Sequence, residues 1–163
     1  MIPEYEQLVR KSNLRSKDIM RNMKHISKMN KVGFDRIVSG YHDEIFAEID
    51  CRKCGNCCRT MSPRFRETDI KLLCKAIGLN PRAFEDEFLK DDEEGVGHVL
   101  KVLPCPFQNS DNDCTVYENR TLSCSDFPHT RARNIQKNLE GLAYDSLICP
   151  AAYLIAEKII AEY

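Results

Sequence analysis

The stretch CRKCGNCC, residues 51–58, places four cysteines within eight residues. Disulfides, a redox pair and metal-binding thiolates are the three explanations for such a density. The chain holds nine cysteines, an odd number that full intramolecular pairing would not use up. The adjacent residues Cys57 and Cys58 cannot readily reach the geometry of a disulfide. The pattern therefore favours metal-binding thiolates.

The remaining composition is that of a globular protein. The chain has 163 residues, 42% of them hydrophobic and 30% charged, and its formal net charge is −1. That charge gives no clear signal for nucleic acid. No apolar run approaches the roughly 20 residues of a membrane-spanning helix, and the N-terminus lacks the apolar stretch of a signal peptide. We therefore predict a cytoplasmic protein without a membrane segment, in which disulfides are not expected.

The cysteines form an ordered series along the chain. C-x2-C-x2-C-C at positions 51, 54, 57 and 58 is followed by single cysteines at 105, 114, 124 and 149. Two-residue spacings let a tight turn direct two sulfurs to one metal, and Gly55 fits that turn. C-x2-C-x2-C also opens the ligand run of bacterial ferredoxins, which bind [4Fe–4S] clusters. Neighbouring side chains diverge on an extended backbone, so Cys57 and Cys58 can serve different metals or different edges of one site.

The residues around the cysteines predict a mainly α-helical fold. Apolar spacings of three or four residues indicate helices from Ser16, as a possible N-cap, to residue 31, and from about 34 to 49. Residues 67–90 indicate two short helices, one capped by Thr68 and ended by Gly78, the other capped by Asn80, and a last helix begins near Ala151. GHVLKVL at 97–103 indicates a strand, with CTVY at 114–117 as its partner.

These patterns predict one small helical domain over residues 1–163, with a short β-hairpin and irregular loops organised around a cysteine-bound metal centre. Residues 1–50 would supply N-terminal helices, residues 51–150 the cysteine-cluster region and residues 151–163 a C-terminal helix. Cys74 lies among the apolar residues of IKLLCKAI and is predicted to be a buried, inert thiol.

Five blocks in this order resemble one known family. They are CRKCGNCC, CPF from Cys105, CTVYENR from Cys114, CSDFP from Cys124 and CP from Cys149. Together they resemble the YkgJ-type cysteine-cluster family, also described as the CxxCxxCC or zinc- or iron-chelating domain, over roughly residues 45 to 152. The resemblance implies a metal-binding module, often labelled an Fe–S oxidoreductase without a known substrate.

The resemblance also implies the ligands, position by position. They are Cys51, Cys54, Cys57, Cys58, Cys105, Cys114, Cys124 and Cys149. The family commonly has Arg-Pro after its YE element, whereas this chain has Arg120 followed by Thr121.

The sequence leaves two alternatives for each of three properties: the identity of the metal, the number of metal sites and the activity of the protein. The C-x2-C-x2-C opening favours a [4Fe–4S] cluster over Zn²⁺, because zinc ribbons generally use separated C-x2-C pairs. Eight thiols allow two four-thiolate sites, or one site with four auxiliary thiols. The protein is either a redox or cluster-dependent oxidoreductase with a redox partner, or a non-catalytic zinc module that stabilises a fold or docks a protein partner. Two roles are open for Arg52, Lys53 and Arg59, in or next to the octet: to offset part of the negative charge of such a site, or to be exposed, solubilising side chains.

Overall fold

The computed structural model describes residues 1–93, 95 and 97–163. The chain divides into two compact units. Unit 1 contains Met1–Cys54 and Pro128–Tyr163, and unit 2 contains the continuous stretch Gly55–Phe127. The predicted fold class is confirmed, because the described residues are mainly helical with one two-stranded antiparallel hairpin.

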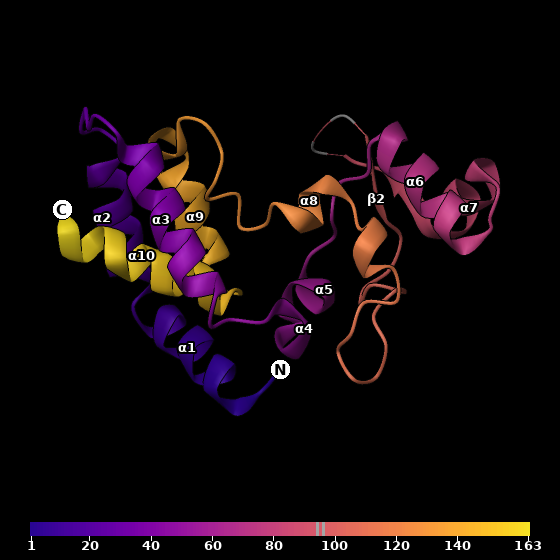
Figure 1. Cartoon of the computed structure of the whole chain (residues 1–163), viewed down its shortest axis with the longest axis horizontal. Helices are drawn as coiled ribbons and strands as arrows, with labels where there is room; N and C mark the ends of the chain where they lie inside the picture. Colours follow the sequence, from indigo (N-terminus) through magenta and orange to yellow (C-terminus); the bar gives the residue numbers. More distant parts are fainter. Residues whose placement is uncertain (94, 96) are drawn as a thin grey trace. The chain divides into compact units, whose positions relative to one another are not determined.

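Unit 1 is a set of helices from both ends of the chain. In chain order they are α1 (Pro3–Leu14), α2 (Ser16–Ile26), α3 (Phe34–Phe46), α4 (Cys51–Cys54), the 3-10 helix η2 (Ile135–Asn138), α9 (Leu139–Asp145) and α10 (Pro150–Glu162). In Figure 1 the yellow C-terminal helix α10 runs among the indigo and purple helices, and it contacts α1, α2, α3 and α9.

The sequence of α10 explains its central place. It begins with Pro150, whose fixed φ suits the first position of a helix. It buries the stripe of Ala152, Ile155 and Ile159, and also Ala151 and Tyr153 on either side of that stripe, so its buried arc is wider than one face. A helix that is apolar nearly all round belongs inside a core rather than on a surface. The amphipathic helix α2, in contrast, buries only its Ile19, Met23 and Ile26 stripe.

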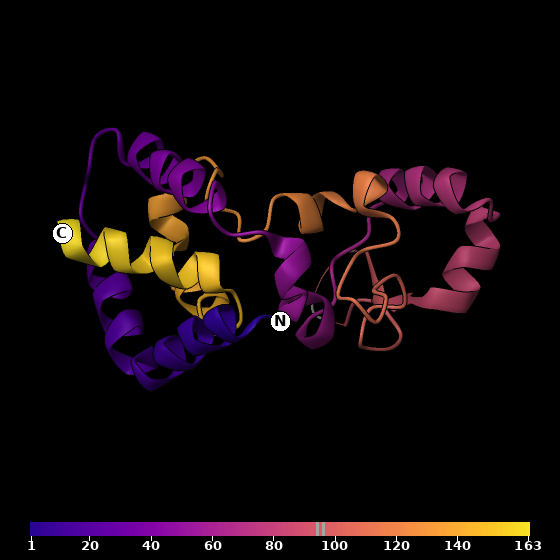
Figure 2. The same ribbon diagram turned by 60° about the horizontal axis from the view of Figure 1, so that its bottom comes forward.

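Unit 2 has shorter elements and more irregular chain. In order they are α5 (Asn56–Thr60), α6 (Glu67–Ile77), α7 (Pro81–Phe88), β1 (Leu89–Asp91), β2 (His98–Leu100), the 3-10 helix η1 (Tyr117–Asn119) and α8 (Leu122–Ser125). Figure 2 shows the pink helices α6 and α7 joined by a short turn. The buried ring of Phe84 in α7 lies 5.2 Å from that of Phe88 and 6.0 Å from that of Phe107, centroid to centroid.

The hairpin differs from the prediction. β2 does lie within the predicted strand, but its antiparallel partner is β1, with Leu89 opposite Leu100, rather than the segment 114–117. Leu89 and Leu100 are both buried, so this pairing adds two side chains to the core of unit 2. Cys114 instead makes an isolated bridge with Gln108 and the chain then turns into η1.

Helix ends were partly predictable. Asn80 caps α7 by accepting the Arg82 N–H at 2.9 Å, and Gly78 ends α6 with a positive φ of 70°, both as predicted. The N-caps predicted at Ser16 and Thr68 were wrong, because Arg15 precedes α2 and Arg66 precedes α6. In α6 the carboxylate of Asp69, the third residue of the helix, accepts the N–H of Arg66 at 3.0 Å, which is the reciprocal bond of a capping box.

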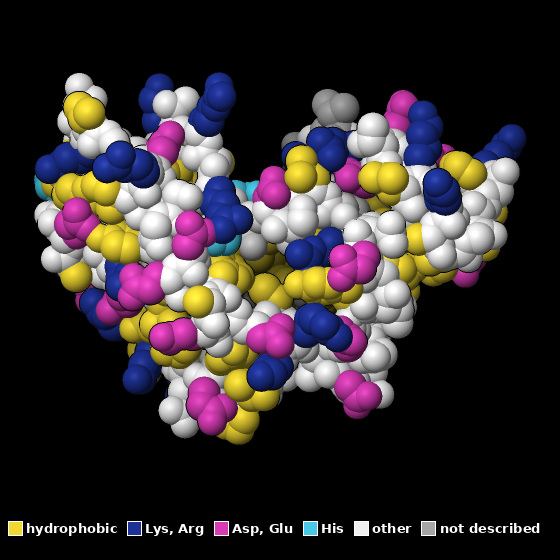
Figure 3. All heavy atoms as spheres, viewed as in Figure 1, with side chains coloured by type: hydrophobic (Ala, Val, Ile, Leu, Met, Phe, Trp, Pro, Cys, Tyr) yellow, Lys and Arg dark blue, Asp and Glu magenta, His cyan; other side chains and the backbone are white. Residues whose placement is uncertain are grey.

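Surface charge is mixed in sign. On the face drawn in Figure 3, lysine and arginine side chains alternate with aspartate and glutamate on each unit, as expected from the net charge of −1. In the part of the chain that the structure describes, none of the helices is long and apolar enough to cross a membrane.

Candidate metal centre

The octet folds as two short helices joined at one glycine. Cys51 and Cys54 begin and end the single turn of α4, and Cys57 and Cys58 lie in α5. Gly55 between them has a φ of 59°, in the left-handed region that glycine adopts without a steric cost. A Cβ there would fall on the side-chain amide nitrogen of Gln108, which donates to the carbonyl of Gly55 at 3.0 Å. The predicted turn at Gly55 is therefore confirmed.

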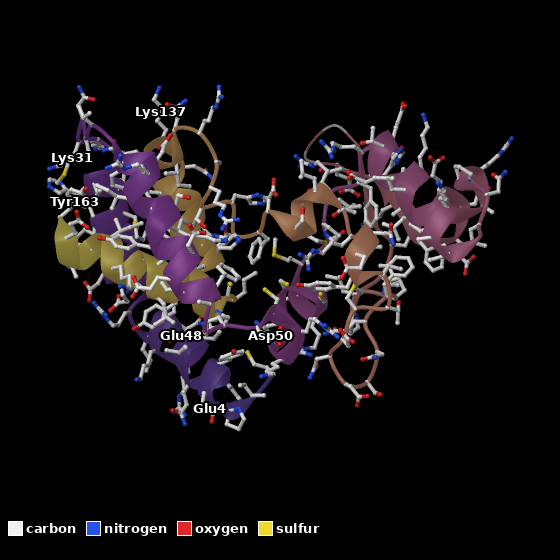
Figure 4. All side chains as sticks on the ribbon, in the orientation of Figure 1. Glu4, Lys31, Glu48, Asp50, Lys137 and Tyr163 are labelled. Carbon is white, nitrogen blue, oxygen red and sulfur yellow. The ribbon has the colours of Figure 1, made fainter. Side chains whose placement is uncertain are left out.

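In unit 1, α4 is held at its start by hydrogen bonds between side chains and the backbone. Asp50 accepts the N–H of Arg52 on its carboxylate at 2.9 Å, which is a helix cap. The hydroxyl of Tyr5 accepts the N–H of Asp50 at 3.0 Å and lies 3.4 Å from the carbonyl of Glu48. Figure 4 labels Glu48 and Asp50 in the segment that leads into this turn. These contacts position Cys51, which is exposed, and Cys54, which is buried.

Cys149 joins the same core as Cys54. It is the N-cap residue of α10, and its Sγ accepts the N–H of Ala152 at 3.5 Å. Cys54 is a buried member of the unit 1 core, and Cys149 packs against that core. The Sγ of Cys54 also lies 3.6 Å from the Sδ of Met1. Three candidate ligands are therefore held in unit 1, two of them against one apolar core.

In unit 2, two loops bring the remaining candidates toward Cys58. The N–H of Cys105 donates to the carbonyl of Cys58 at 2.7 Å, which fixes the Cys105 loop against α5. Cys114 bridges Gln108, whose side chain binds Gly55. Cys105 and Cys114 both pack against the core of unit 2. Cys57 and Cys58 are half-buried neighbours in α5, and their side chains are hydrogen-bonded.

Cys124 is placed by the cap of α8. Thr121 is the N-cap residue, and its hydroxyl accepts the N–H of Cys124 at 3.2 Å. This threonine stands where the family resemblance leads one to expect proline, and it starts the helix through a hydrogen bond instead. Thr121 is buried, whereas Cys124 as a whole residue is exposed.

The thiols of unit 2 affect one another electrostatically. Burial raises the pKa of Cys105 to about 11, and the nearby charges of Cys58, Cys124 and Cys114 raise it further. Burial also raises the pKa of Cys114 and of Cys124, and the charge of Cys58 acts in the same direction on both. The hydrogen bond from Cys57, with smaller contributions from the cationic side chains of Arg59 and Arg120, lowers the pKa of Cys58 to about 7 despite its burial. One thiolate therefore lies among three thiols that resist ionisation.

The corresponding effect in unit 1 centres on Cys149. Burial raises the pKa of its thiol to about 12, and the charges of Cys51 and Cys54 add to the rise. The backbone N–H groups of Ala152 and Ala151 act the other way, as expected at a helix N-terminus, but they are outweighed. Without a compensating cation, three ionised thiols in this unit would repel one another.

The basic residues nearest the thiols are only partly those predicted. Of the three basic residues in the octet region, Arg59 lowers the pKa of Cys58 and hydrogen-bonds the side chain of Asn112. Arg52 and Lys53 are exposed on α4. Arg120 was missed as a charge partner. Its guanidinium carbon lies 3.8 Å from the centroid of the Tyr117 ring, and its charge lowers the pKa of Cys58.

Asp69 is a second residue that the sequence analysis missed. Its buried carboxylate accepts the N–H of Leu122 at 3.2 Å and pairs with the guanidinium of Arg66 at 3.0 Å, so it ties the start of α8 to α6. Burial alone would raise the pKa of Asp69, but the hydrogen bonds from Arg66 and Leu122 outweigh burial and hold it below its ordinary value. The available signal was its place three residues after Arg66, where an acid completes a capping box.

Cys74 differs from the other cysteines in its surroundings. It is buried in α6 among the core side chains of unit 2, as predicted. Burial raises the pKa of its thiol. It is therefore an apolar core residue.

The side chains as they stand do not form a preassembled ligand cage. Among the described residues, no three His, Cys, Asp or Glu side chains are arranged so that they could hold a metal ion. The donor chemistry nevertheless suits a soft metal, because thiolates select zinc, copper(I) and iron–sulfur clusters over hard cations. A bound cation would also offset the burial and the charge repulsion that raise the pKa of Cys105, Cys114, Cys124 and Cys149.

A comparison with family models gives one match to this chain. A model described as "CxxCxxCC: Putative zinc- or iron-chelating domain" matches residues 50–150, which contain all eight candidate cysteines. Comparisons with curated proteins and with solved structures give no match.

Proposed function

Because the chain belongs to the CxxCxxCC family of zinc- or iron-chelating domains, we propose that it is an iron–sulfur protein that binds a [4Fe–4S] cluster through cysteine thiolates. The observation that carries the proposal is that unit 2 brings together ligand segments that are far apart in the sequence. The N–H of Cys105 donates to the carbonyl of Cys58 at 2.7 Å, and Cys114 bridges Gln108, whose side chain donates to the carbonyl of Gly55. The charge of Cys58 raises the pKa of Cys105, Cys114 and Cys124, although the four residues are spread over 67 positions of the sequence. A shared cation of high charge explains why a fold would gather such groups.

The residues present fit an iron–sulfur cluster in number and in kind. The ligands would be drawn from Cys51, Cys54, Cys57, Cys58, Cys105, Cys114, Cys124 and Cys149. Clusters of this type are held by four cysteine thiolates, and the octet contains the C-x2-C-x2-C spacing of the ferredoxin run. When bound, the cluster supplies one-electron redox chemistry, so a redox partner protein is part of the proposal.

The protein's own contribution is to favour the thiolate state at Cys58 and to hold the ligand segments of unit 2 together. Arg59 and Arg120 place positive charge near Cys58. The carbonyl of Cys58 is bound to the Cys105 loop, and Asp69 holds the start of the helix that carries Cys124. These contacts keep the ligand segments close together before any metal is bound.

A non-catalytic zinc module is the second candidate, and the small core of unit 2 favours it. Among the described residues this core contains nine buried hydrophobic side chains, against nineteen in unit 1. A structural Zn²⁺ contributes folding free energy where apolar burial is limited. Such a module would be fully cysteine-ligated and redox-silent, and it could dock a protein partner.

Anaerobic purification followed by metal and sulfide analysis tests the proposal. We expect stoichiometric iron and acid-labile sulfide, a broad visible absorption band that bleaches on reduction, and an EPR signal in the reduced state. Stoichiometric zinc in a colourless protein would contradict the iron–sulfur proposal and favour the zinc module.

A matched pair of variants tests the ligand assignment. Combined replacement of Cys51, Cys54 and Cys57 by serine should reduce the cluster signal, whereas replacement of the buried Cys74 by alanine should not. An unchanged cluster signal in the triple variant would contradict the assignment. Circular dichroism would show that both variants are folded.

A further inference from the structure

The boundary between the two units lies inside the octet. Unit 1 ends at Cys54 and unit 2 begins at Gly55. The candidate ligands are divided accordingly. Cys51, Cys54 and Cys149 belong to unit 1, and Cys57, Cys58, Cys105, Cys114 and Cys124 belong to unit 2. The family's eight-cysteine series is thus split between two compact parts of the chain, and the split is invisible in the spacing of the motif.

The four thiols of unit 2 are joined by contacts within that unit. The Cys105 N–H donates to the Cys58 carbonyl at 2.7 Å. The bridge of Cys114 with Gln108 closes the loop that carries Cys105 and Cys114. Cys124 is linked by charge, because Cys58 and Cys114 both act on its thiol. The charge of Cys58 raises the pKa of each of the other three thiols, Cys105, Cys114 and Cys124. Cys58 is therefore the residue that links the set.

The three thiols of unit 1 are joined in the same way within their own unit. The one-turn helix α4 carries Cys51 and Cys54 three residues apart, which places both on one face. Cys54 is part of the apolar core against which Cys149 packs, and Cys51 and Cys54 both act on the Cys149 thiol. The thiol charges that raise the pKa of Cys149 come from two cysteines of its own unit.

We infer that the cysteine series serves two separate metal sites, one formed by Cys58, Cys105, Cys114 and Cys124 and the other containing Cys51, Cys54 and Cys149. The inference rests on the proposed function, since it presupposes that the thiols bind metal. Four thiolates complete the ligand set of either a tetrahedral Zn²⁺ or a [4Fe–4S] cluster, so the first set needs no ligand from the other unit. Cys57, hydrogen-bonded to Cys58, stays unchanged in the tests below.

Two multiple-serine variants of the full chain test the division. One replaces Cys58, Cys105, Cys114 and Cys124, and the other replaces Cys51, Cys54 and Cys149. With metal per chain measured by mass spectrometry after anaerobic purification, each variant should keep part of the metal, and the two losses should add up to the wild-type content. Cys74→Ala is the control and should lose none. Complete metal loss from either folded variant would mean one shared centre and would overturn the inference.

Smaller variants keep the test decisive if a multiple variant fails to fold. Cys114 and Cys124 lie in one proposed set. The double variant Cys114→Ser with Cys124→Ser should therefore lose no more metal than the single variant with the greater loss. Cys114→Ser combined with Cys149→Ser crosses the sets and should lose the sum of the two single losses. Additive losses within a set, or non-additive losses across sets, would contradict the division. Wild-type protein that binds neither zinc nor iron would instead refute the proposed function.

Discussion

Nine cysteines share one side chain, and their surroundings give them different chemistry. Cys58 has a pKa of about 7 because Cys57 donates to it and two arginines lie nearby, whereas burial raises the pKa of Cys105 to about 11. Cys74 is surrounded by core side chains of α6 and its neighbours. Sequence spacing separated Cys74 from the rest because it matches no cysteine block. It could not show which of the others would ionise first, since Arg120 acts on Cys58 across 62 positions of the sequence.

Replacement of Cys74 by alanine should leave metal binding unchanged. The substitution removes one buried sulfur, so we expect the free energy of unfolding to fall by roughly 1–2 kcal/mol. Chemical denaturation measures that loss, and metal analysis measures the metal content per chain. A folded Cys74→Ala protein that has lost metal would show that this thiol is a ligand after all.

Asp145, the last residue of α9, should make the stability of unit 1 depend on pH. Burial raises its pKa to about 6 from the ordinary 3.8. The raised pKa means that Asp145 favours the folded state below about pH 4, and that this contribution is lost as the pH rises through about 6. Because one unit of pKa corresponds to about 1.4 kcal/mol, Asp145→Asn should stabilise the protein by roughly 1–3 kcal/mol at pH 7 and by little at pH 4.

Thermal unfolding of the wild type and Asp145→Asn at the two pH values checks this expectation. Glu140→Gln is the matched control, since it removes one negative charge from an exposed position of the same helix. A gain from Asp145→Asn that is equal at pH 4 and pH 7 would contradict the argument.

Single elements show where local sequence rules suffice and where they fail. α7 and α10 follow their local signals, with Asn80 or Cys149 at the N-cap and proline at the first position. The β-hairpin failed because strand pairing depends on which side chains share a core. Leu89 and Leu100 meet in unit 2, while the β-branched segment 114–117 turns away after one bridge. Asp69 was missed for a similar reason, since its bond to Leu122 spans 53 positions.

The turn at Gly55 should be the most sensitive glycine of the candidate site. In Gly55→Ala the left-handed backbone costs about 1–2 kcal/mol, and the new Cβ meets Gln108 and Asn112. We therefore expect both a larger loss of stability than strain alone gives and a loss of metal, because Cys57 and Cys58 follow this turn. Gly78→Ala is the matched control, since Gly78 has a φ of 70° but open space around its Cα.

Chemical denaturation and metal analysis of both glycine variants separate these effects. The Gly78 variant should lose stability through strain and keep its metal. Equal metal content in the two variants would show that the close approach of Gln108 to Gly55 does not matter for the site.

The whole chain is two unequal units, and this division was not accessible from sequence. Hydrophobic spacing and capping signals are local, whereas unit 1 combines Met1–Cys54 with Pro128–Tyr163. The contacts that join those ends, such as Ser12 with Ser146 at 3.0 Å, pair residues more than a hundred positions apart. The motif does not indicate the boundary between the units, which falls between its second and third cysteines.

Metal removal should loosen unit 2 more than unit 1. Among the described residues the core of unit 2 contains nine buried hydrophobic side chains and that of unit 1 nineteen, so unit 2 has less apolar burial to hold it without metal. After chelation under reducing conditions, amide hydrogen exchange followed by mass spectrometry should accelerate mainly within Gly55–Phe127. Equal acceleration in α2, α3 and α10 would contradict this expectation.

The division also sets an order of events during synthesis on the ribosome. Gly55–Phe127 is one continuous stretch, so its core and its four proposed ligands are complete once Cys124 has left the exit tunnel. Unit 1 must wait for α10, because the N-terminal helices that emerge first lack the apolar helix around which they pack. Cys149 arrives 25 residues after Cys124. The nascent chain therefore has a period in which one half can fold and take up metal while the other half still exposes the apolar faces of α1, α2 and α3.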